Sequence, residues 1–360
     1  MRARHALFAG FGLGGLVVLV AVVLLGGNGV ISLTKALRPT PTSSPESSPS
    51  PSPAPTPATS IEAGPGPRAG AVFVFDPENH GVILFGGSKV VPQPDGTNPS
   101  VTLDDTWLWN GKSWRKLDVQ GPPARSAAVA AYDSARHVIV VFGGSGPTGA
   151  GQARLLQDTW TWDGRQWQQL HPVHSPNPRF DAAFAFDEAR GEGVLYGGEG
   201  DTTIYNATWT WDGADWTLQD PKTVPPARRF PSMAYDAARS TAVLFGGSLP
   251  GVRFNDTWLW DGTNWSQSTA PAPAASGWSE MVYDSAHSQI VAYVYFGLDN
   301  HPVAEYTITW DGKGWTDRTT ASDPSPRAIV SLAYDPEIKQ VVLYGPGDEL
   351  WTWDGSSWSR

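Results

Sequence analysis

Five arginines recur at similar intervals in the chain, each just ahead of a short apolar run. Guanidinium groups that converge can each hold a carboxylate or a phosphate with two parallel hydrogen bonds. If the fold brings these arginines together, their chemistry predicts an anion-binding site. The alternative is that an arginine repeated in this way braces strand ends or caps backbone carbonyls. The five residues are Arg68, Arg125, Arg179, Arg228 and Arg327.

The arginines belong to a repeat with two parts. The first runs from Arg through an aromatic-Asp pair to an apolar run and Gly-Gly. The second is Thr-Trp-x-Trp-Asp-Gly-x-x-Trp, with some substitutions, and its six copies hold 17 of the 18 Trp residues. Rings this large at a fixed offset serve to pack, so we expect core positions for them, Trp160 and Trp209 included. The second part begins at Thr106, Thr159, Thr208, Thr257, Thr307 and Leu350.

The period of the repeat is typical of a propeller rather than of a solenoid. Counted from Arg to Arg, with Gly277 in the fifth position, the intervals are 57, 54, 49, 49 and 50 residues. Each copy contains four short β-like segments separated by Asp/Gly turns. In the second copy these are residues 127–132, 138–142, 159–162 and 167–170. The first segment is rich in Ala, which suits an innermost strand, and the Trp-rich third segment suits the wider outer part of a blade.

This order of Arg, aromatic-Asp, Gly-Gly and the Trp block resembles the kelch repeat, as in the central domain of galactose oxidases. The resemblance implies an all-β, six-bladed kelch-like β-propeller over residues 67–360. Its last copy stops at Trp358-Ser359-Arg360. We expect residues near Ile61 to complete the outer strand of blade six, or else a short last strand. The expected blades are residues 67–120, 121–174, 175–222, 223–271, 272–322 and 323–360.

The resemblance also places the arginines and the loops after Gly-Gly on one face, at the mouth of the central channel. The arginines would form an incomplete ring there, interrupted in blade five by Gly277-Trp278. Trp278 is the one Trp outside the Trp blocks, and an exposed ring beside arginines could stack on a sugar. The alternative for Trp278 is drift within one repeat, with its ring packed between blades. The predicted ligand-binding residues are Arg68, Arg125, Arg179, Arg228, Arg327 and Trp278.

The N-terminal part predicts a membrane tether. Residues 1–5 form a basic flank, and residues 6–27 are apolar and long enough to cross about 30 Å of hydrocarbon as a helix. No clear small-x-small cleavage site follows, so we expect a transmembrane signal-anchor, with cleavage and secretion as the alternative. Residues 28–66 form a Pro/Ser/Thr-rich linker, with eight prolines in residues 39–60. Such a composition predicts a disordered, extended stalk.

Composition excludes several functions. The net charge is −10, and because residues 1–38 hold four basic and no acidic residues, the rest carries −14; this argues against nucleic acid as a partner. The chain has no Cys, which rules out disulfides, thiolate metal sites and the Cys-dependent copper chemistry of galactose oxidases. His171 and His174 lack a third ligand. We expect no cofactor and no metal.

These observations favour a non-catalytic binding module, a monomeric propeller held outside a bacterial cell membrane. Its ligand would be an anionic glycan or an acidic protein segment at the arginine-lined mouth. One alternative is a glycan-active enzyme on the same face, of the sialidase or sugar-epimerase kind. No Tyr-Glu pair in the sequence can be nominated as its nucleophile and base, so we name no catalytic residue. The other alternative is a surface scaffold without a small ligand.

Overall fold

The computed structural model describes residues 64–93, 96–147, 153–272, 277–296, 304–320, 323–324, 329–347 and 349–360. The predicted basic flank, the predicted membrane span over residues 6–27 and most of the predicted linker lie outside these residues. Within the described ranges, no helix is long and apolar enough to cross a membrane. The tether therefore stays a prediction.

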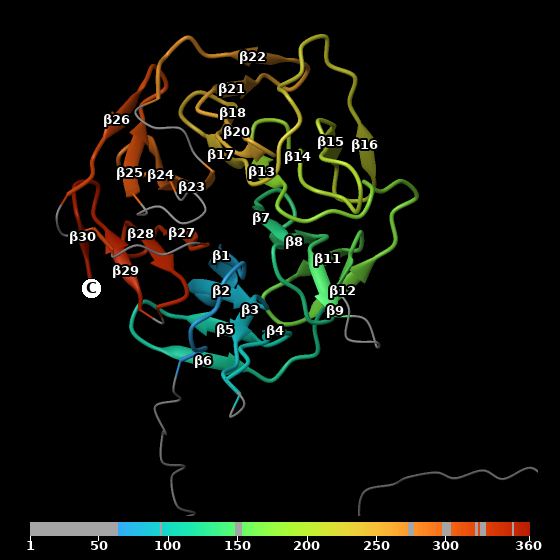
Figure 1. Ribbon diagram of the computed structural model, residues 1–360, viewed down its shortest axis with the longest axis vertical. Helices are drawn as coiled ribbons and strands as arrows, with labels where there is room; N and C mark the ends of the chain where they lie inside the picture. Colours follow the sequence, from blue (N-terminus) through green and yellow to red (C-terminus); the bar gives the residue numbers. More distant parts are fainter. Residues whose placement is uncertain are drawn as a thin grey trace, which may run out of the picture. The chain divides into compact units, whose positions relative to one another are not determined.

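Six four-stranded antiparallel sheets surround a central axis, one sheet for each repeat (Figure 1). Blades one to three contain β1 (Val72–Asp76), β2 (Gly81–Phe85), β5 (Thr106–Trp109) and β6 (Trp114–Leu117); β7 (Val129–Asp133), β8 (Val138–Phe142), β11 (Thr159–Trp162) and β12 (Trp167–Leu170); and β13 (Ala183–Asp187), β14 (Glu192–Tyr196), β15 (Thr208–Trp211) and β16 (Trp216–Leu218). Blades four to six contain β17 (Ser232–Asp236), β18 (Thr241–Phe245), β21 (Thr257–Trp260) and β22 (Trp265–Gln267); β23 (Trp278–Asp284), β24 (Gln289–Phe296), β25 (Ala304–Trp310) and β26 (Trp315–Asp317); and β27 (Ser331–Asp335), β28 (Gln340–Tyr344), β29 (Trp351–Trp353) and β30 (Trp358–Ser359). The all-β, six-bladed propeller predicted from the sequence is confirmed.

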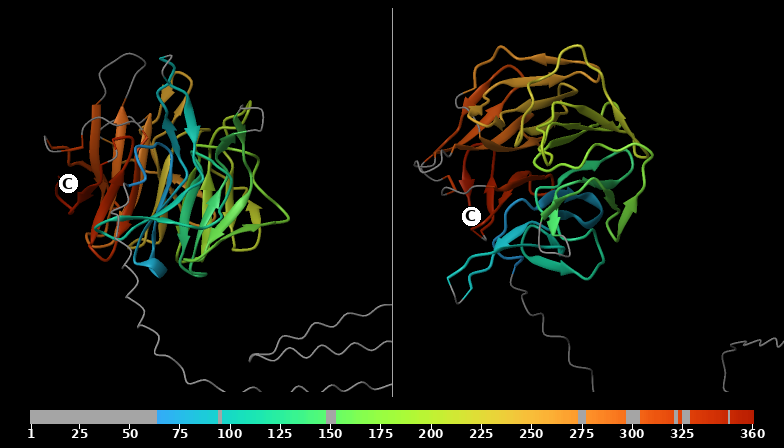
Figure 2. Two further views of the ribbon diagram at one scale, coloured as in Figure 1. Left: turned by 90° about the horizontal axis from the view of Figure 1, so that it is seen from below. Right: turned by 45° about the vertical axis from the view of Figure 1, so that its right-hand side comes forward.

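Three short hairpins follow the second strands of blades one, two and four. They rise from one face of the propeller (Figure 2), which we call the mouth face: the face on which first strands begin and second strands end. The hairpins are β3 (Ser88–Val90) with β4 (Ser100–Thr102), β9 (Ser145–Pro147) with β10 (Ala153–Leu155), and β19 (Ser248–Leu249) with β20 (Val252–Arg253). A single 3₁₀ turn, η1 (Pro77–Asn79), lies on the opposite face.

In blade two the observed strands match the predicted ones except at the first. β8, β11 and β12 have the predicted bounds, whereas β7 begins at Val129 rather than at residue 127. Ala127 has a left-handed backbone with φ 54°, which places it before the strand. This conformation turns its N–H toward blade one, where it donates to the Gly70 carbonyl over 2.8 Å.

The same bond repeats around the channel. Asp181 N–H donates to the Ala127 carbonyl over 3.2 Å, and Phe230 N–H to the Asp181 carbonyl over 2.9 Å. Asp181 and Phe230 also have left-handed backbones, with φ of 51° and 57°. Residues with a side chain rarely adopt this conformation, and here each one links its blade to the preceding blade.

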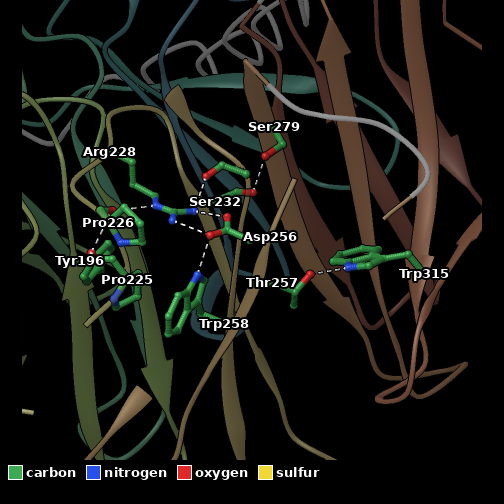
Figure 3. Close-up of polar contacts among 11 residues, drawn as sticks. Tyr196, Pro225, Pro226, Arg228, Ser232, Asp256, Thr257, Trp258, Ser279 and Trp315 are labelled. Atoms are coloured by element: carbon green, nitrogen blue, oxygen red, sulfur yellow. Dashed lines mark hydrogen bonds and ion pairs between the residues drawn. The ribbon is translucent and has the colours of Figure 1, made fainter. Parts of the chain in front are cut away.

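The third Trp of each Trp block joins its blade to the preceding one. In blades two to six its indole Nε1–H donates to the first Thr of the preceding block over 2.8–3.0 Å. Figure 3 shows one of these bonds, from Trp315 to Thr257. The rings are buried against the aromatic residue that ends the second strand of the preceding blade, as for Trp167 on Phe85 and Trp216 on Phe142. The five pairs are Trp167–Thr106, Trp216–Thr159, Trp265–Thr208, Trp315–Thr257 and Trp358–Thr307.

The junction between blades six and one is built differently. Leu350 takes the place of the Thr, and Trp114 packs edge-on against Tyr344, with ring centroids 5.3 Å apart. Tyr344 donates to the Gly66 carbonyl over 2.7 Å, and Ser331 to the Ala71 carbonyl over 2.9 Å. The outer strand of blade six is β30, from its own repeat, so the expected alternative of a short last strand is correct. Ile61 lies outside the described residues.

On the opposite face, an arginine contact between blades explains why the Trp-Asp-Gly turn contains a glycine. Asp133, at the end of β7, holds Arg136 through a 2.8 Å bond. Arg136 reaches into blade three and donates to the carbonyls of Gly191, over 3.0 Å, and Asp212. Gly213 has φ 95°, and a Cβ there would lie 1.8 Å from Arg136 Nε. Arg190 makes the same link to the carbonyl of Asp261 in blade four.

In blade three we expect the second Trp of the block to matter more for stability than the first. Trp211 is 1% exposed, whereas Trp209 and Trp160, for which the sequence predicted core positions, are only partly buried. Trp211→Ala should lower the free energy of unfolding by about 3–5 kcal/mol, and Trp209→Ala by roughly 1–2 kcal/mol. Denaturant unfolding of the two variants measures the difference. Equal losses would contradict the packing described above.

Candidate functional site

The arginines of the predicted ring lie inside the blades. Arg68, Arg125, Arg179 and Arg228 are between 0% and 3% exposed. Each donates from Nη1 to the carbonyl of the first Gly in the Gly-Gly pair of its own blade, over 2.9–3.0 Å. Each also donates from Nε to the carbonyl two residues earlier in the chain. These are the bonds expected of an arginine that braces strand ends.

Three of the four arginines also bind an aspartate that directly precedes the Trp block. Arg228 donates to both oxygens of Asp256 over 2.6 and 2.9 Å, and Trp258 donates to the same carboxylate over 2.7 Å (Figure 3). Burial alone would raise the pKa of Asp256, but the hydrogen bonds and charge of Arg228 hold it below its usual value. Arg125 with Asp158 and Arg68 with Asp105 repeat the arrangement.

Blade three lacks this aspartate, because Ala207 stands in its place. Arg179 stacks on Tyr205 instead, with its guanidinium carbon 4.1 Å from the ring centroid. Burial lowers the pKa of Arg179 to about 10, and the Tyr205 hydroxyl opposes the shift. Arg179 thus stays cationic at neutral pH without a carboxylate beside it.

The Gly-Gly pair and the arginine backbone hold neighbouring blades together. The N–H of Gly87 donates to the Arg125 carbonyl over 2.8 Å, and blades two and three repeat the bond toward Arg179 and Arg228. Gly86 has φ 68°, and a Cβ on it would lie 2.7 Å from the Arg125 carbonyl oxygen. A side chain at Gly86 would therefore push the two blades apart. Arg327 lies outside the described residues, and a ligand-binding role for the five arginines stays a prediction.

The channel mouth is lined by two rings of residues, found by counting back from the Asp that ends each first strand. The outer ring, six positions back, is Gly70, Ala127, Asp181, Phe230, Trp278 and Ile329; the inner ring, four positions back, is Val72, Val129, Ala183, Ser232, Glu280 and Ser331. All twelve residues line one cavity of about 170 Å³. Its wall is uneven, because blades one and two contribute Gly and Ala to the outer ring, and blades four and five contribute Phe and Trp.

Two carboxylates face this cavity, and they are the only charged residues in the two rings. Enclosure by the inner strands raises the pKa of Asp181 well above its usual value; the charges of Glu199 and Glu280 raise it further and that of Arg229 lowers it. Enclosure also raises the pKa of Glu280 to about 8. Glu280 is still accessible to water in the channel, and hydration opposes the shift. The sequence reasoning missed both residues, although counting from the strand-end Asp would have found them.

Trp278 lines the same cavity, so one residue of the predicted site lies at the channel mouth. Its ring is half-buried and packs edge-on against Phe230 of blade four, with centroids 4.4 Å apart. Tyr295 of β24 lies on another side, with centroids 6.1 Å apart. The rings packed against Trp278 thus come from blades four and five, and none of the arginines of the predicted ring is among these contacts.

Three exposed large apolar side chains lie on hairpins of the mouth face: Val90 and Val101 on the β3–β4 hairpin, and Val252 on the β19–β20 hairpin. Val173 and Val224 lie in connections from one blade to the next, beside the Asp-Gly turns of the following blades, because the N–H groups of His174 and Thr223 donate to Asp215 and Asn264. Ile338 lies in the first turn of blade six, on the opposite face. The exposed apolar side chains of the mouth face are thus those of its hairpins.

A Tyr-Glu pair does exist in the structure. Tyr293, at the position of Tyr196 and Tyr344 in other blades, donates to a Glu305 carboxylate oxygen. It is 1% exposed and packs against Trp358, so it has the same role as the second-strand aromatic residues on which the third Trp of the next blade packs. Among the described residues, no group of three or more His, Asp or Glu could hold a metal ion. His174 pairs with Asp215 over 2.7 Å.

The arginine–aspartate pairs should be structural. Arg228→Met leaves the Asp256 carboxylate without its cation, and we expect a loss of about 3–5 kcal/mol in the free energy of unfolding. Arg179→Met is the matched control, since it leaves only carbonyls unpaired and should cost about 1–3 kcal/mol. Chemical denaturation of both variants provides the comparison. An Arg228→Met variant as stable as the parent protein would mean that the pair does not brace the blade.

Glu280 should destabilise the propeller as the pH rises. Its pKa is higher in the folded protein than the usual Glu value, so the folded state loses stability between about pH 4 and pH 8 as the carboxylate ionises, and no more above that. Glu280→Gln should therefore raise Tm by a few degrees at pH 8 and leave it almost unchanged at pH 4. Thermal melts across this range test the sign. A variant that melts lower at pH 8 would show that the carboxylate has a stabilising partner.

Comparison with known proteins agrees with this architecture. The family model of the KLHDC2/KLHL20/DRC7 Kelch-repeats domain matches residues 93–293, more than half of the chain. No curated protein matches the sequence closely enough to count as a relative. The match covers blades two to four in full and parts of blades one and five, and the structure has the six blades that the repeat predicts. The chain therefore belongs to the kelch-repeat family of β-propellers.

Proposed function

We propose that the chain is a non-catalytic protein-interaction module whose partner docks on the mouth face. Kelch propellers typically serve as protein-interaction modules, and the family match supports that class. The observation that carries the proposal is the exposure of Val90, Val101 and Val252 on the hairpins that rise from the mouth face. Exposed apolar side chains on a rigid scaffold are typical of interaction surfaces when they gather on one face.

A protein partner fits this face better than an anionic glycan does. The donors of an anion site would be the arginine guanidinium groups, and those described are buried in bonds to carbonyls and aspartates. Exposed basic side chains on the mouth-face hairpins, Lys89 and Arg154, lie on separate hairpins, and the charged residues in the two rings of the channel mouth are acidic. The Tyr293–Glu305 pair does not favour the enzyme alternative, because Tyr293 has the packing role of its counterparts in other blades.

The proposed N-terminal tether would hold the propeller at a membrane. The apolar span over residues 6–27 would hold the chain in a bacterial membrane, and the Pro-rich stalk would present the propeller outside the cell. Residues 39–60 in an extended conformation reach about 70 Å. That length would separate the propeller from the membrane. The alternative is cleavage and secretion, which leaves the docking surface unchanged.

Site-specific photocrosslinking in producing cells tests the docking surface. A photoreactive residue at Val90, Val101 or Val252 should crosslink the same partner, and one at Ile338, on the opposite face, should not. Fractionation of the same cells tests the tether, which predicts that the chain stays with membranes after carbonate washing. Crosslinks from Ile338 alone would place the docking surface on the opposite face and contradict the proposal. A mature N-terminus near residue 28 would replace the anchor with secretion.

A further inference from the structure

The cavity at the channel mouth contains two carboxylates that nothing in the described part of the chain neutralises. The carboxylate groups of Asp181 and Glu280 have no hydrogen bond or ion pair to another described residue. The one cation acting on Asp181 is Arg229, and Arg229 is itself paired with Glu199 over 2.8 Å. The surroundings of Asp181 therefore carry excess negative charge.

Glu280 departs from the pattern of its ring. The equivalent residues in the other blades are small or apolar: Val72, Val129, Ala183, Ser232 and Ser331. Two of these, Ser232 and Ser331, use their hydroxyls in contacts between blades. A carboxylate at this position adds nothing to the packing of the ring, and its ionisation in an enclosed channel costs stability. A ligand that neutralises it would offset that cost.

The aromatic wall of the cavity suits an organic cation. Trp278 with Phe230 and Tyr295 lines the side formed by blades four and five. Cations are attracted to the faces of such rings, and most strongly to Trp; the guanidinium carbon of Arg229 already lies 5.3 Å from the centroid of the Phe230 ring. Opposite lie Gly70 and Ala127, whose small size leaves the space open. The cavity of about 170 Å³ is close to the roughly 150 Å³ that accommodates a benzene molecule, and an arginine side chain is only slightly larger.

We propose that the channel mouth binds a guanidinium or alkylammonium group, presented as an arginine or lysine side chain by the docked protein partner. The cation lies between Asp181 and Glu280, with its alkyl stem against Trp278. This inference rests on the proposed function for the source of the cation, but the chemistry of the site does not depend on it. A carboxylate or phosphate ligand would be repelled by the same two residues.

Binding should depend on pH in a defined direction. The charged groups that act on Asp181 are Glu199, Glu280 and Arg229, and enclosure alone acts on Glu280. A bound cation favours the ionised carboxylates, so complex formation releases protons below about pH 8. Affinity should therefore rise from pH 5.5 to pH 8.5. An anion held by arginines would show no such rise.

Calorimetric titration of the full chain in a neutral detergent tests the site. The probes are Nα-acetyl-arginine-methylamide and the neutral Nα-acetyl-glutamine-methylamide. The arginine probe should bind at pH 8.5 with Kd on the order of 1 mM, since one side chain offers few atoms; the glutamine probe should not bind. Asp181→Asn and Glu280→Gln should each weaken binding at least tenfold without lowering Tm. Glu188→Gln, an exposed carboxylate on the opposite face, is the matched control and should leave binding unchanged.

Three results would overturn the cation site: equal binding of the glutamine probe, saturable binding of methyl glucoside in its place, or full arginine binding by the Asp181→Asn/Glu280→Gln protein. Photocrosslinking from Val90 separates this inference from the proposed function. If the double variant still crosslinks its partner while the arginine probe fails to bind the parent protein, the docking surface is supported and the cation site is ruled out. If the probe binds but a photoreactive residue at Val90 captures no partner, the cation site is supported and its ligand is a free small molecule rather than a side chain of a protein partner.

Discussion

Every feature of this molecule depends on contacts between one blade and the next. A four-stranded sheet of about 20 residues has two faces to bury, and its own repeat supplies only one layer. The repeated residues supply the links. Trp216 donates to Thr159 of the preceding blade, and the N–H of Gly87 donates to the Arg125 carbonyl on the mouth face. On the opposite face, Arg136 donates to a carbonyl of blade three. The recurring residues are thus the ones that hold blades together.

This division of labour accounts for what could be predicted from the sequence. Trp and Gly-Gly have few uses besides filling space and permitting left-handed backbone, so their spacing predicted six blades and nearly all strand bounds in blade two. Arginine is ambiguous, because the same guanidinium group can grip a ligand or a carbonyl. Only the structure shows that Arg228 points into its own blade toward Asp256, and spacing alone carries no information about side-chain direction.

The residues that do not repeat are the better guide to recognition. Asp181, Trp278 and Glu280 occupy positions that the other blades fill with small or aliphatic residues, apart from Phe230. Their departure from the pattern was visible in the sequence for Trp278. It was hidden for Asp181, because the predicted first strand of blade two already included Ala127, so the left-handed residue that precedes this strand was not recognised as a separate position at the channel mouth. A ring of equivalent positions thus becomes an asymmetric site through a few substitutions that the scaffold tolerates.

Hydrogen exchange of the backbone amides, followed by mass spectrometry on the full chain, tests most directly whether blade-to-blade links hold the ring. Five junctions have the Trp–Thr bond, and the junction of blades six and one has Leu350 instead. If these links hold the ring, β29 and β6, the two strands at the junction without the bond, should exchange before the corresponding strands of the other blades. Protection that is lost first at the junction of blades three and four, where Trp265 is bonded to Thr208, would contradict this account.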